Sequence, residues 1–209
     1  MAQQRLDKII ASTGRYSRRE VKTLVREGRV LVDGRIAASA EDKCDPLTAR
    51  ISVNGEELFY REHTYVMLHK PAGMLSATED GRGETVLDLL PPELRRRALS
   101  PVGRLDKDTE GLLLFTDDGM LDVRLLRPER HVEKEYEYRA FGLLDETAMR
   151  QLEEGVLLLE GQPPSLPARA QLLAHTSIGE SAPYLPERFR EKYLKNPARP
   201  VTTGKLWIT

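Results

Sequence analysis

The sequence has few of the features that define secreted, membrane and metal-binding proteins. Its 209 residues include one cysteine, Cys44, so a single chain can form neither an internal disulfide nor a cysteine-based metal site. No apolar run approaches the roughly 20 residues needed to cross a bilayer, and the first residues carry no apolar signal core. We therefore expect a cytoplasmic protein in a reducing compartment, with no membrane partner.

A large net charge and the common catalytic motifs are also missing. Because 32 Lys and Arg stand against 33 Asp and Glu, the formal charge of -1 gives no overall sign of a nucleic-acid partner. The chain has neither a phosphate loop nor a Gly-x-Ser-x-Gly elbow. The histidines are too scattered for a zinc site and are interpreted as surface or structural residues: His63, His69, His131 and His175. No metal and no cofactor is predicted.

The length and the changing pattern of the chain indicate two unequal domains. Residues 1–60 read as a small domain, and residues 56–63 as a polar linker at its end. From residue 61 to residue 209 the pattern changes to longer strands, such as "YVMLHKPAG" and "GLLLFTDD", which alternate with helical stretches such as "TVLDLLPPELRRRA" and "DETAMRQLEEG". This larger domain is predicted to be mixed α/β or α+β.

The first 40 residues predict two helices followed by a hairpin. Ser17 and Glu20 form a capping box, so a helix is expected to begin at about Arg18. Gly28 supplies the left-handed stop of this helix, and Asp33-Gly34 is a two-residue hairpin signal. The unit resembles the S4 RNA-binding module over most of its length.

Positive charge gathers on this small unit. It has nine Lys and Arg but four Asp and Glu in residues 1–40, and Arg18, Lys22 and Arg26 lie on one helix face. Such a row is either a solvated face or a contact for a phosphate backbone, and the arginines on adjoining turns favour RNA binding. The predicted RNA-binding residues are Arg5, Arg15, Arg18, Arg19, Lys22, Arg26, Arg29 and Lys70.

A carboxylate between two cations is the main chemical feature of the larger domain. "SPVGRLDKDTEGLLLFTDDG", residues 100–119, places Asp106 beside Arg104 and Lys107 between two strand-like stretches. Asp106 is either a turn residue that caps backbone N–H groups or a nucleophile that nearby positive charge keeps ionised. Spacing alone does not choose between these uses.

"VGRLDKDTEGLLLFTDDG" resembles the signature of RsuA-type pseudouridine synthases, which isomerise a single uridine in ribosomal RNA. "YVMLHKPAGMLSATED" and "HVEKEYEYRA" support the resemblance, which runs from Arg5 to the end of the chain. It implies an α+β fold with an S4-like domain and a mainly antiparallel catalytic domain, and no cofactor. We also expect a monomer. "SATED" and "GRLDKDTEG" lean toward the small-subunit enzymes, so the implied partner is 16S ribosomal RNA or a small-subunit assembly intermediate, with 23S RNA as the alternative.

The resemblance also implies roles for individual residues. Asp106 becomes the nucleophile, acting at C1' or on the uracil ring. Arg104 would fill the space left by the flipped nucleotide, although a surface salt bridge with Asp106 or Asp108 is the alternative. Tyr136 would stack on the uracil near its C5 proton, unless it is an ordinary half-buried strand tyrosine. Lys70-Pro71 is expected to shape the pocket rather than to react.

The chain departs from the family pattern in two places. Residues 200–209 contain no counterpart of the basic C-terminal motif that supplies a cation to the catalytic carboxylate, so the catalytic domain is interpreted as incomplete. Residues 174–199 form an insertion in which "PERFREKYLKN" predicts a short helix. An RNA- or ribosome-binding protein without turnover, or a fragment of a longer protein, therefore stays open as the second hypothesis.

Overall fold

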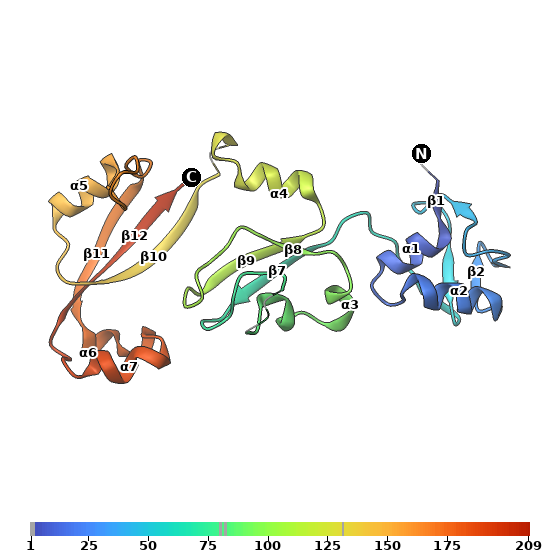
Figure 1. Cartoon of the computed structure of the whole chain (residues 1–209), viewed down its shortest axis with the longest axis horizontal. Coiled ribbons are helices and arrows are strands. Elements are labelled where there is room, and N and C mark those ends of the chain that lie inside the picture. The colour runs from blue at the N-terminus through green and yellow to red at the C-terminus, as the bar shows by residue number, and fades with distance from the viewer. Residues whose placement is uncertain (1–2, 80, 82, 131) are drawn as a thin grey trace. The chain divides into compact units, whose positions relative to one another are not determined.

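The structure, a computed structural model, describes residues 3–79, 81, 83–130 and 132–209 and so leaves the predicted surface residue His131 outside. Its chain forms two compact units, Met1–Val123 and Arg124–Thr209, which are described separately (Figure 1). Within the described ranges no helix is both long and apolar enough to span a membrane. Since the chain divides after Val123, the domain boundary near residue 60 stays a prediction.

The first unit begins with two helices and two small antiparallel sheets, ordered β1-β4 and β3-β2-β5-β6. Its elements are β1 (Gln4–Arg5), α1 (Leu6–Ser12), α2 (Arg18–Arg26), β2 (Val30–Val32), β3 (Arg35–Ile36), β4 (Lys43–Cys44), β5 (Ile51–Val53) and β6 (Glu56–Leu58). The apolar faces of α1 and α2 pack on the strands, with Ile10 and Val21 at 0% exposure. This core fixes α2 with its charged face toward solvent.

The local signals of the first 60 residues produce the predicted elements. Ser17 and Glu20 make both hydrogen bonds of the capping box at the start of α2. Asp33 and Asn54 adopt positive φ angles of 50° and 56° in the turns β2–β3 and β5–β6, as two-residue hairpins require. The expected linker at 56–63 is partly wrong, because its first three residues form β6 against β5.

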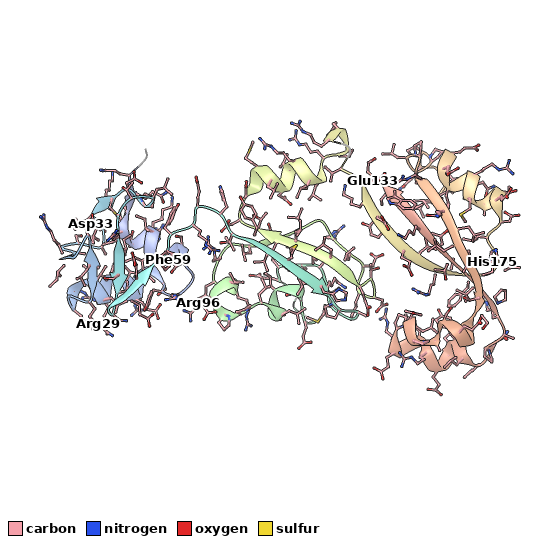
Figure 2. All side chains as sticks on the ribbon, turned by 180° about the vertical axis from the view of Figure 1, so that it is seen from behind. Arg29, Asp33, Phe59, Arg96, Glu133 and His175 are labelled. Carbon is pink, nitrogen blue, oxygen red and sulfur yellow. The ribbon has the colours of Figure 1, made fainter. Side chains whose placement is uncertain are left out.

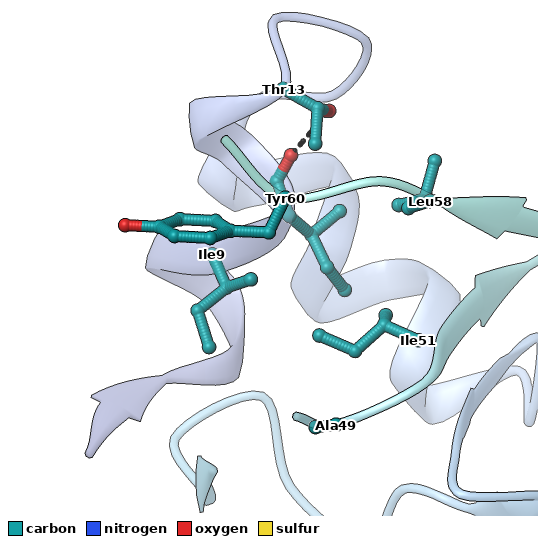
Figure 3. A pocket seen from close by; sticks show the side chains of 7 residues that line it. Ile9, Thr13, Ala49, Ile51, Leu58 and Tyr60 are labelled. Atoms are coloured by element: carbon teal, nitrogen blue, oxygen red, sulfur yellow. Dashed lines mark hydrogen bonds between the residues drawn. The ribbon is translucent and has the colours of Figure 1, made fainter. Parts of the chain in front are cut away.

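A small apolar cavity lies inside this core (Figure 3). It is lined by Ile9, Ile10, Thr13, Ala49, Ile51, Leu58 and Tyr60. The Thr13 hydroxyl donates to the Ile10 carbonyl oxygen at 2.7 Å, so this polar group of the lining is already hydrogen-bonded. A volume of about 10 Å³ is at the lower limit for one water molecule. The cavity is therefore a packing feature rather than a ligand site.

A three-stranded antiparallel sheet, ordered β7-β9-β8, completes the first unit. Its elements are β7 (Tyr65–Lys70), η1 (Val86–Leu89), α3 (Pro92–Arg95), β8 (Ser100–Val102) and β9 (Gly111–Thr116), and α4 (Gly119–Leu126) crosses into the second unit. Phe115 and Val86, both at 0% exposure, join β9 and η1 in one core. The predicted helical stretch is split into η1 and α3, because Pro91-Pro92 interrupts the backbone hydrogen bonds.

The second unit is built on long antiparallel strands ordered β10-β12-β11. Its elements are η2 (Pro128–Arg130), β10 (Lys134–Phe141), α5 (Glu146–Glu154), β11 (Arg169–Ser177), α6 (Ile178–Ser181), η3 (Ala182–Tyr184), α7 (Glu187–Leu194) and β12 (Pro200–Ile208). The short helix predicted in the insertion is confirmed as α7. The α+β prediction is also confirmed, since all the strand pairs of the four sheets are antiparallel.

Candidate active site

The loop at residues 103–110 joins β8 to its neighbour β9 and carries the predicted nucleophile. Gly103 and Gly111 bound it with positive φ angles of 79° and 130°, which glycine adopts without a steric penalty. Inside the loop, the Thr109 N–H donates to the Asp106 carbonyl oxygen at 3.0 Å. The chain therefore reverses direction in a tight turn that begins at Asp106.

Asp106 and Arg104 both lie at the surface of this loop. Among the described residues, no backbone N–H donates to the Asp106 carboxylate and no ion pair joins it to Arg104. Within the described residues, the Asp106 carboxylate therefore does not cap the turn, which was one of the two roles that the sequence allowed. Its backbone carbonyl oxygen accepts hydrogen bonds within the protein, and its side chain lies at the surface.

Lys70, at the end of β7, binds the backbone of this loop from the protein interior. Its side chain is 0% exposed, and its ammonium donates to four backbone carbonyl oxygens. These belong to Pro71 (3.1 Å), Asp106 (3.0 Å), Lys107 (3.0 Å) and Thr109 (2.8 Å). Three of the four acceptors lie in the 103–110 loop, so one cation ties the end of β7 to the turn that presents Asp106.

The burial of Lys70 has an electrostatic consequence. Removal from water lowers the pKa of the ammonium, and the carboxylates of Glu110 and Asp106 act in the opposite direction. The four carbonyl oxygens stabilise the charged form, because a buried cation needs hydrogen-bond acceptors in place of water. The Asp106 carboxylate is thus one of the groups that favour the charged form of Lys70.

This geometry does not agree with the prediction that Lys70 binds RNA. An ammonium with four carbonyl partners and no exposed surface cannot reach a phosphate without breaking the loop apart. The other expectation for Lys70-Pro71, that the pair shapes the pocket, stays a prediction.

The segment that follows Lys70 continues along the same loop. The Gly73 N–H donates to the Lys107 carbonyl oxygen at 2.8 Å. Further on, the Ser76 hydroxyl donates to the Leu105 carbonyl oxygen at 2.7 Å and accepts from the Leu105 N–H at 3.1 Å. Residues 70–76 and the loop therefore run side by side and are joined at three points.

Tyr136 lies in the second unit, on β10, whereas Asp106, Arg104 and Lys70 belong to the first. It is half-buried and pairs with Leu206 of β12. Tyr138, two residues further along the same strand, points its hydroxyl at the Met149 sulfur at 3.6 Å, and burial raises its pKa. Of the two tyrosines, Tyr138 is the one with an identified packing partner on α5.

The positive face predicted for the S4-like part is present on α2. Arg18, Lys22 and Arg26 are exposed, and the apolar residues of the opposite face are buried. Lys22 approaches Glu41 at 3.8 Å, a distance that contributes little in solvent. This face of the helix therefore offers three cations to an anionic partner.

Three other predicted RNA-binding arginines differ in the number of ion pairs that they make within the protein. Arg5 binds Asp7 at 2.9 Å and Glu41 at 3.0 Å, so its donors are largely engaged. Arg15 and Arg29 each make one exposed ion pair, with Glu56 and Glu27 respectively. Exposed pairs of this kind exchange partners at little cost, which leaves these two arginines available to a phosphate.

A surface hollow next to α2 adds residues that the sequence analysis missed. It measures about 440 Å³ and is lined by Tyr16, Arg19, Glu20, Thr23, Leu24, Glu27, Arg29 and Asn54. Figure 2 shows Arg29 at the surface of this part of the chain. The Asn54 amide donates to the Tyr16 hydroxyl at 3.4 Å, so a phenol ring lies beside two predicted cations. The Asn54-Gly55 turn was the available signal, because it brings Asn54 back to this face.

Potential metal ligands do not gather in the described part of the chain. No group of three or more His, Cys, Asp or Glu side chains has a geometry suited to a metal ion there. The carboxylates of Glu110 and Asp106 both interact electrostatically with the Lys70 ammonium. These residues offer an exposed carboxylate on a loop whose backbone is hydrogen-bonded to a buried cation.

Comparison with known proteins adds family matches to this geometry. The model for RNA pseudouridylate synthase matches residues 64–178, and the model for the S4 domain matches residues 4–46. An uncharacterized RNA pseudouridine synthase of Bacillus subtilis is 46% identical over 181 residues, which cover 87% of this chain and 75% of the relative.

Two further relatives carry more specific names. Ribosomal large subunit pseudouridine synthase B of Bacillus subtilis is 37% identical over 82% of this chain and 68% of its own length. The protein of the same name from Escherichia coli (strain K12) is 40% identical over 76% of this chain and 56% of its own length. A crystal structure of a pseudouridylate synthase matches with a TM-score of 0.51 and 27% identity, covering 100% of this chain and 77% of the other.

The family model covers more than half of the chain, and it includes both the loop with Asp106 and the segment with Lys70. The matched S4 domain includes α1, α2 and their positive face. The chain belongs to the RNA pseudouridylate synthase family and carries an S4 domain ahead of the synthase domain.

Proposed function

We propose that this protein isomerises a uridine of ribosomal RNA to pseudouridine, with Asp106 as the nucleophile. The observation that carries the proposal is the exposed Asp106 carboxylate on a loop whose backbone is bound by a fully buried Lys70. The reaction breaks the N1–C1' bond, turns the uracil and joins C5 to C1', and the proton on C5 is lost. It needs a placed carboxylate and a means of retaining the detached base.

The exposed position of Asp106 suits an attack on a nucleotide that has been turned out of its stack. Its carboxylate either bonds to C1' as the N1–C1' electron pair leaves with the uracil, or adds to the uracil ring. Arg104, two residues earlier and also exposed, would occupy the space that the nucleotide leaves. Tyr136 would stack on the uracil and assist the transfer of the C5 proton.

The S4 part would bind the RNA backbone through α2 and its neighbouring arginines. The sequence motifs favour 16S RNA or a small-subunit intermediate, whereas two of the relatives described above are named for the large subunit. We give the large-subunit RNA the greater weight, because those names belong to proteins that match over three-quarters or more of this chain. Both RNAs belong in the test.

The test is tritium release from ribosomal RNA labelled at uridine C5, with the parent protein beside Asp106→Asn. We expect release by the parent with one of the two RNAs and none by the variant. RNA affinity should stay within about tenfold, because the carboxylate acts on the reaction and adds little to backbone binding. An active Asp106→Asn protein would refute the nucleophile. Binding without release by either protein would favour an RNA-binding protein without turnover.

A further inference from the structure

Ser76 makes an unusual contact with the residue that precedes Asp106. Its hydroxyl satisfies both main-chain groups of Leu105, donating to the carbonyl oxygen at 2.7 Å and accepting from the N–H at 3.1 Å. The side chain is 9% exposed, so water does not compete freely for these bonds. A single buried hydroxyl thus makes both of the backbone hydrogen bonds that a neighbouring strand would otherwise make with Leu105.

The two bonds act on two different peptide planes. The Leu105 N–H belongs to the peptide that joins Arg104 to Leu105, and its carbonyl belongs to the peptide that joins Leu105 to Asp106. Because a peptide unit is planar, holding one atom of each plane restricts the rotations on either side of Leu105. The next plane, between Asp106 and Lys107, is held through its carbonyl by Lys70 at 3.0 Å. Three consecutive peptide planes around Asp106 are therefore fixed by side chains of one segment.

Ser76 is itself anchored on the core. Its neighbour Leu75 forms a bridge with Thr85, and the Val86 N–H donates to the Leu75 carbonyl oxygen at 2.9 Å. Val86 is 0% exposed in the core beneath the sheet. Because the backbone next to Ser76 is fixed on the core, the Ser76 hydroxyl holds Leu105 at a fixed position relative to that core. A serine on a mobile surface segment could not do this.

We propose that Ser76 is a positioning residue for the isomerisation, which directs the Asp106 carboxylate by fixing the backbone on both sides of Leu105. The inference rests on the proposed function of Asp106 and adds a residue that does not touch the uridine. Misplacement of a reacting group by about 1 Å can cost about a hundredfold in rate. Loss of the hydroxyl should therefore lower the rate of the chemical step and leave RNA binding intact.

The experiment uses the full chain and labelled ribosomal RNA, with enzyme in excess, to measure the single-turnover rate and the RNA dissociation constant separately. Ser76→Ala should slow the single-turnover step about 10- to 100-fold and change the dissociation constant less than about threefold. Ser76→Thr, which keeps the hydroxyl, should recover most of the rate. Ser76→Cys, which is similar in size but a weak donor, should stay slow.

Ser100→Ala is the matched control. The Ser100 hydroxyl also donates to a main-chain carbonyl, that of Thr116 at 3.4 Å, but this bond lies at the end of the same sheet away from the loop. The control should keep the parent rate. A Ser76→Ala rate within about threefold of the parent would overturn the inference, as would a loss that appears wholly in RNA affinity.

Two further outcomes are informative. If Ser76→Ala does not fold, the comparison of Ser76→Thr with Ser76→Cys decides, and equal rates for these two would overturn the positioning role. A parent protein with no release that depends on Asp106 would refute the proposed function, and this inference would fall with it. An active parent with an unaffected Ser76→Ala variant would refute the positioning role alone.

Discussion

The replacement Lys70→Met tests the buried cation that supports the active loop. Methionine keeps the length and apolar character of the side chain but removes the ammonium. The four carbonyl oxygens at 2.8 to 3.1 Å then lose a donor, and three of them lie in the loop of Asp106. Because Lys70 is 0% exposed, the void is too enclosed for several water molecules to replace the ammonium at once.

The size of the effect can be worked out from these partners. A buried acceptor that loses its donor costs about 1–3 kcal/mol, so four would cost about 4–12 kcal/mol at most. The Asp106 carbonyl oxygen still accepts from the Thr109 N–H, and the exposed face of the loop can be hydrated. The variant is also relieved of burying a charge. We therefore expect a loss of about 2–4 kcal/mol in the free energy of unfolding of the first unit.

Urea unfolding followed by circular dichroism measures this loss, and hydrogen exchange over residues 100–116 locates it. The matched control is Lys107→Met, because Lys107 is an exposed lysine of the same loop and should change stability by no more than about 0.5 kcal/mol. Equal stabilities for the two variants would show that the ammonium does not support the loop. Normal exchange in the loop with a general loss of stability would show that the effect is not local.

Two further predictions concern the S4 part. Neutralising Arg18, Lys22 and Arg26, which form one exposed row on α2, should weaken RNA binding and reduce the slope of log affinity against log salt by about 2 to 3. A salt titration by filter binding measures this, and an unchanged slope would exclude a phosphate contact there. The hydrogen bond from Arg5 lowers the pKa of Asp7, so this carboxylate stabilises the fold above its unfolded pKa of about 4, and the stabilisation is lost as pH falls through the lowered folded value. Asp7→Asn should cost about 1 kcal/mol at neutral pH, since Arg5 is partly exposed, and should flatten the dependence of stability on acid pH; equal acid sensitivity in both proteins would contradict it.

The sequence was most informative where the cause of a structure is local. The start of α2 depends on Ser17 and Glu20, which lie three residues apart, and the two hairpins depend on Asp33-Gly34 and Asn54-Gly55. Each signal includes both of its interacting partners within a few residues, so it can be read without knowing the fold. The apolar stretches "YVMLHKPAG" and "GLLLFTDD" likewise predicted β7 and β9, although not the way in which they pair.

The sequence was least informative where a contact joins distant residues. Lys70 lies 36 residues from Asp106, and lysine is among the residue types that are almost never fully buried, so the sequence alone favours an RNA-binding role for it. Ser76 lies 29 residues from Leu105 and has no unusual neighbours in sequence. Neither role could be found from spacing, because both depend on β7 and β9 pairing side by side.

The hydrogen bonds of Lys70 explain why a lysine rather than an apolar residue belongs at the end of β7. The turn that presents Asp106 directs several carbonyl oxygens inward, and this cluster of negative partial charge needs a donor that can reach all of them. An ammonium has three protons in tetrahedral directions and meets that need, whereas a hydroxyl has only one. The loop is then bound along its backbone while the Asp106 side chain stays exposed. The cost of burying the lysine is offset in the same hydrogen bonds that place the carboxylate.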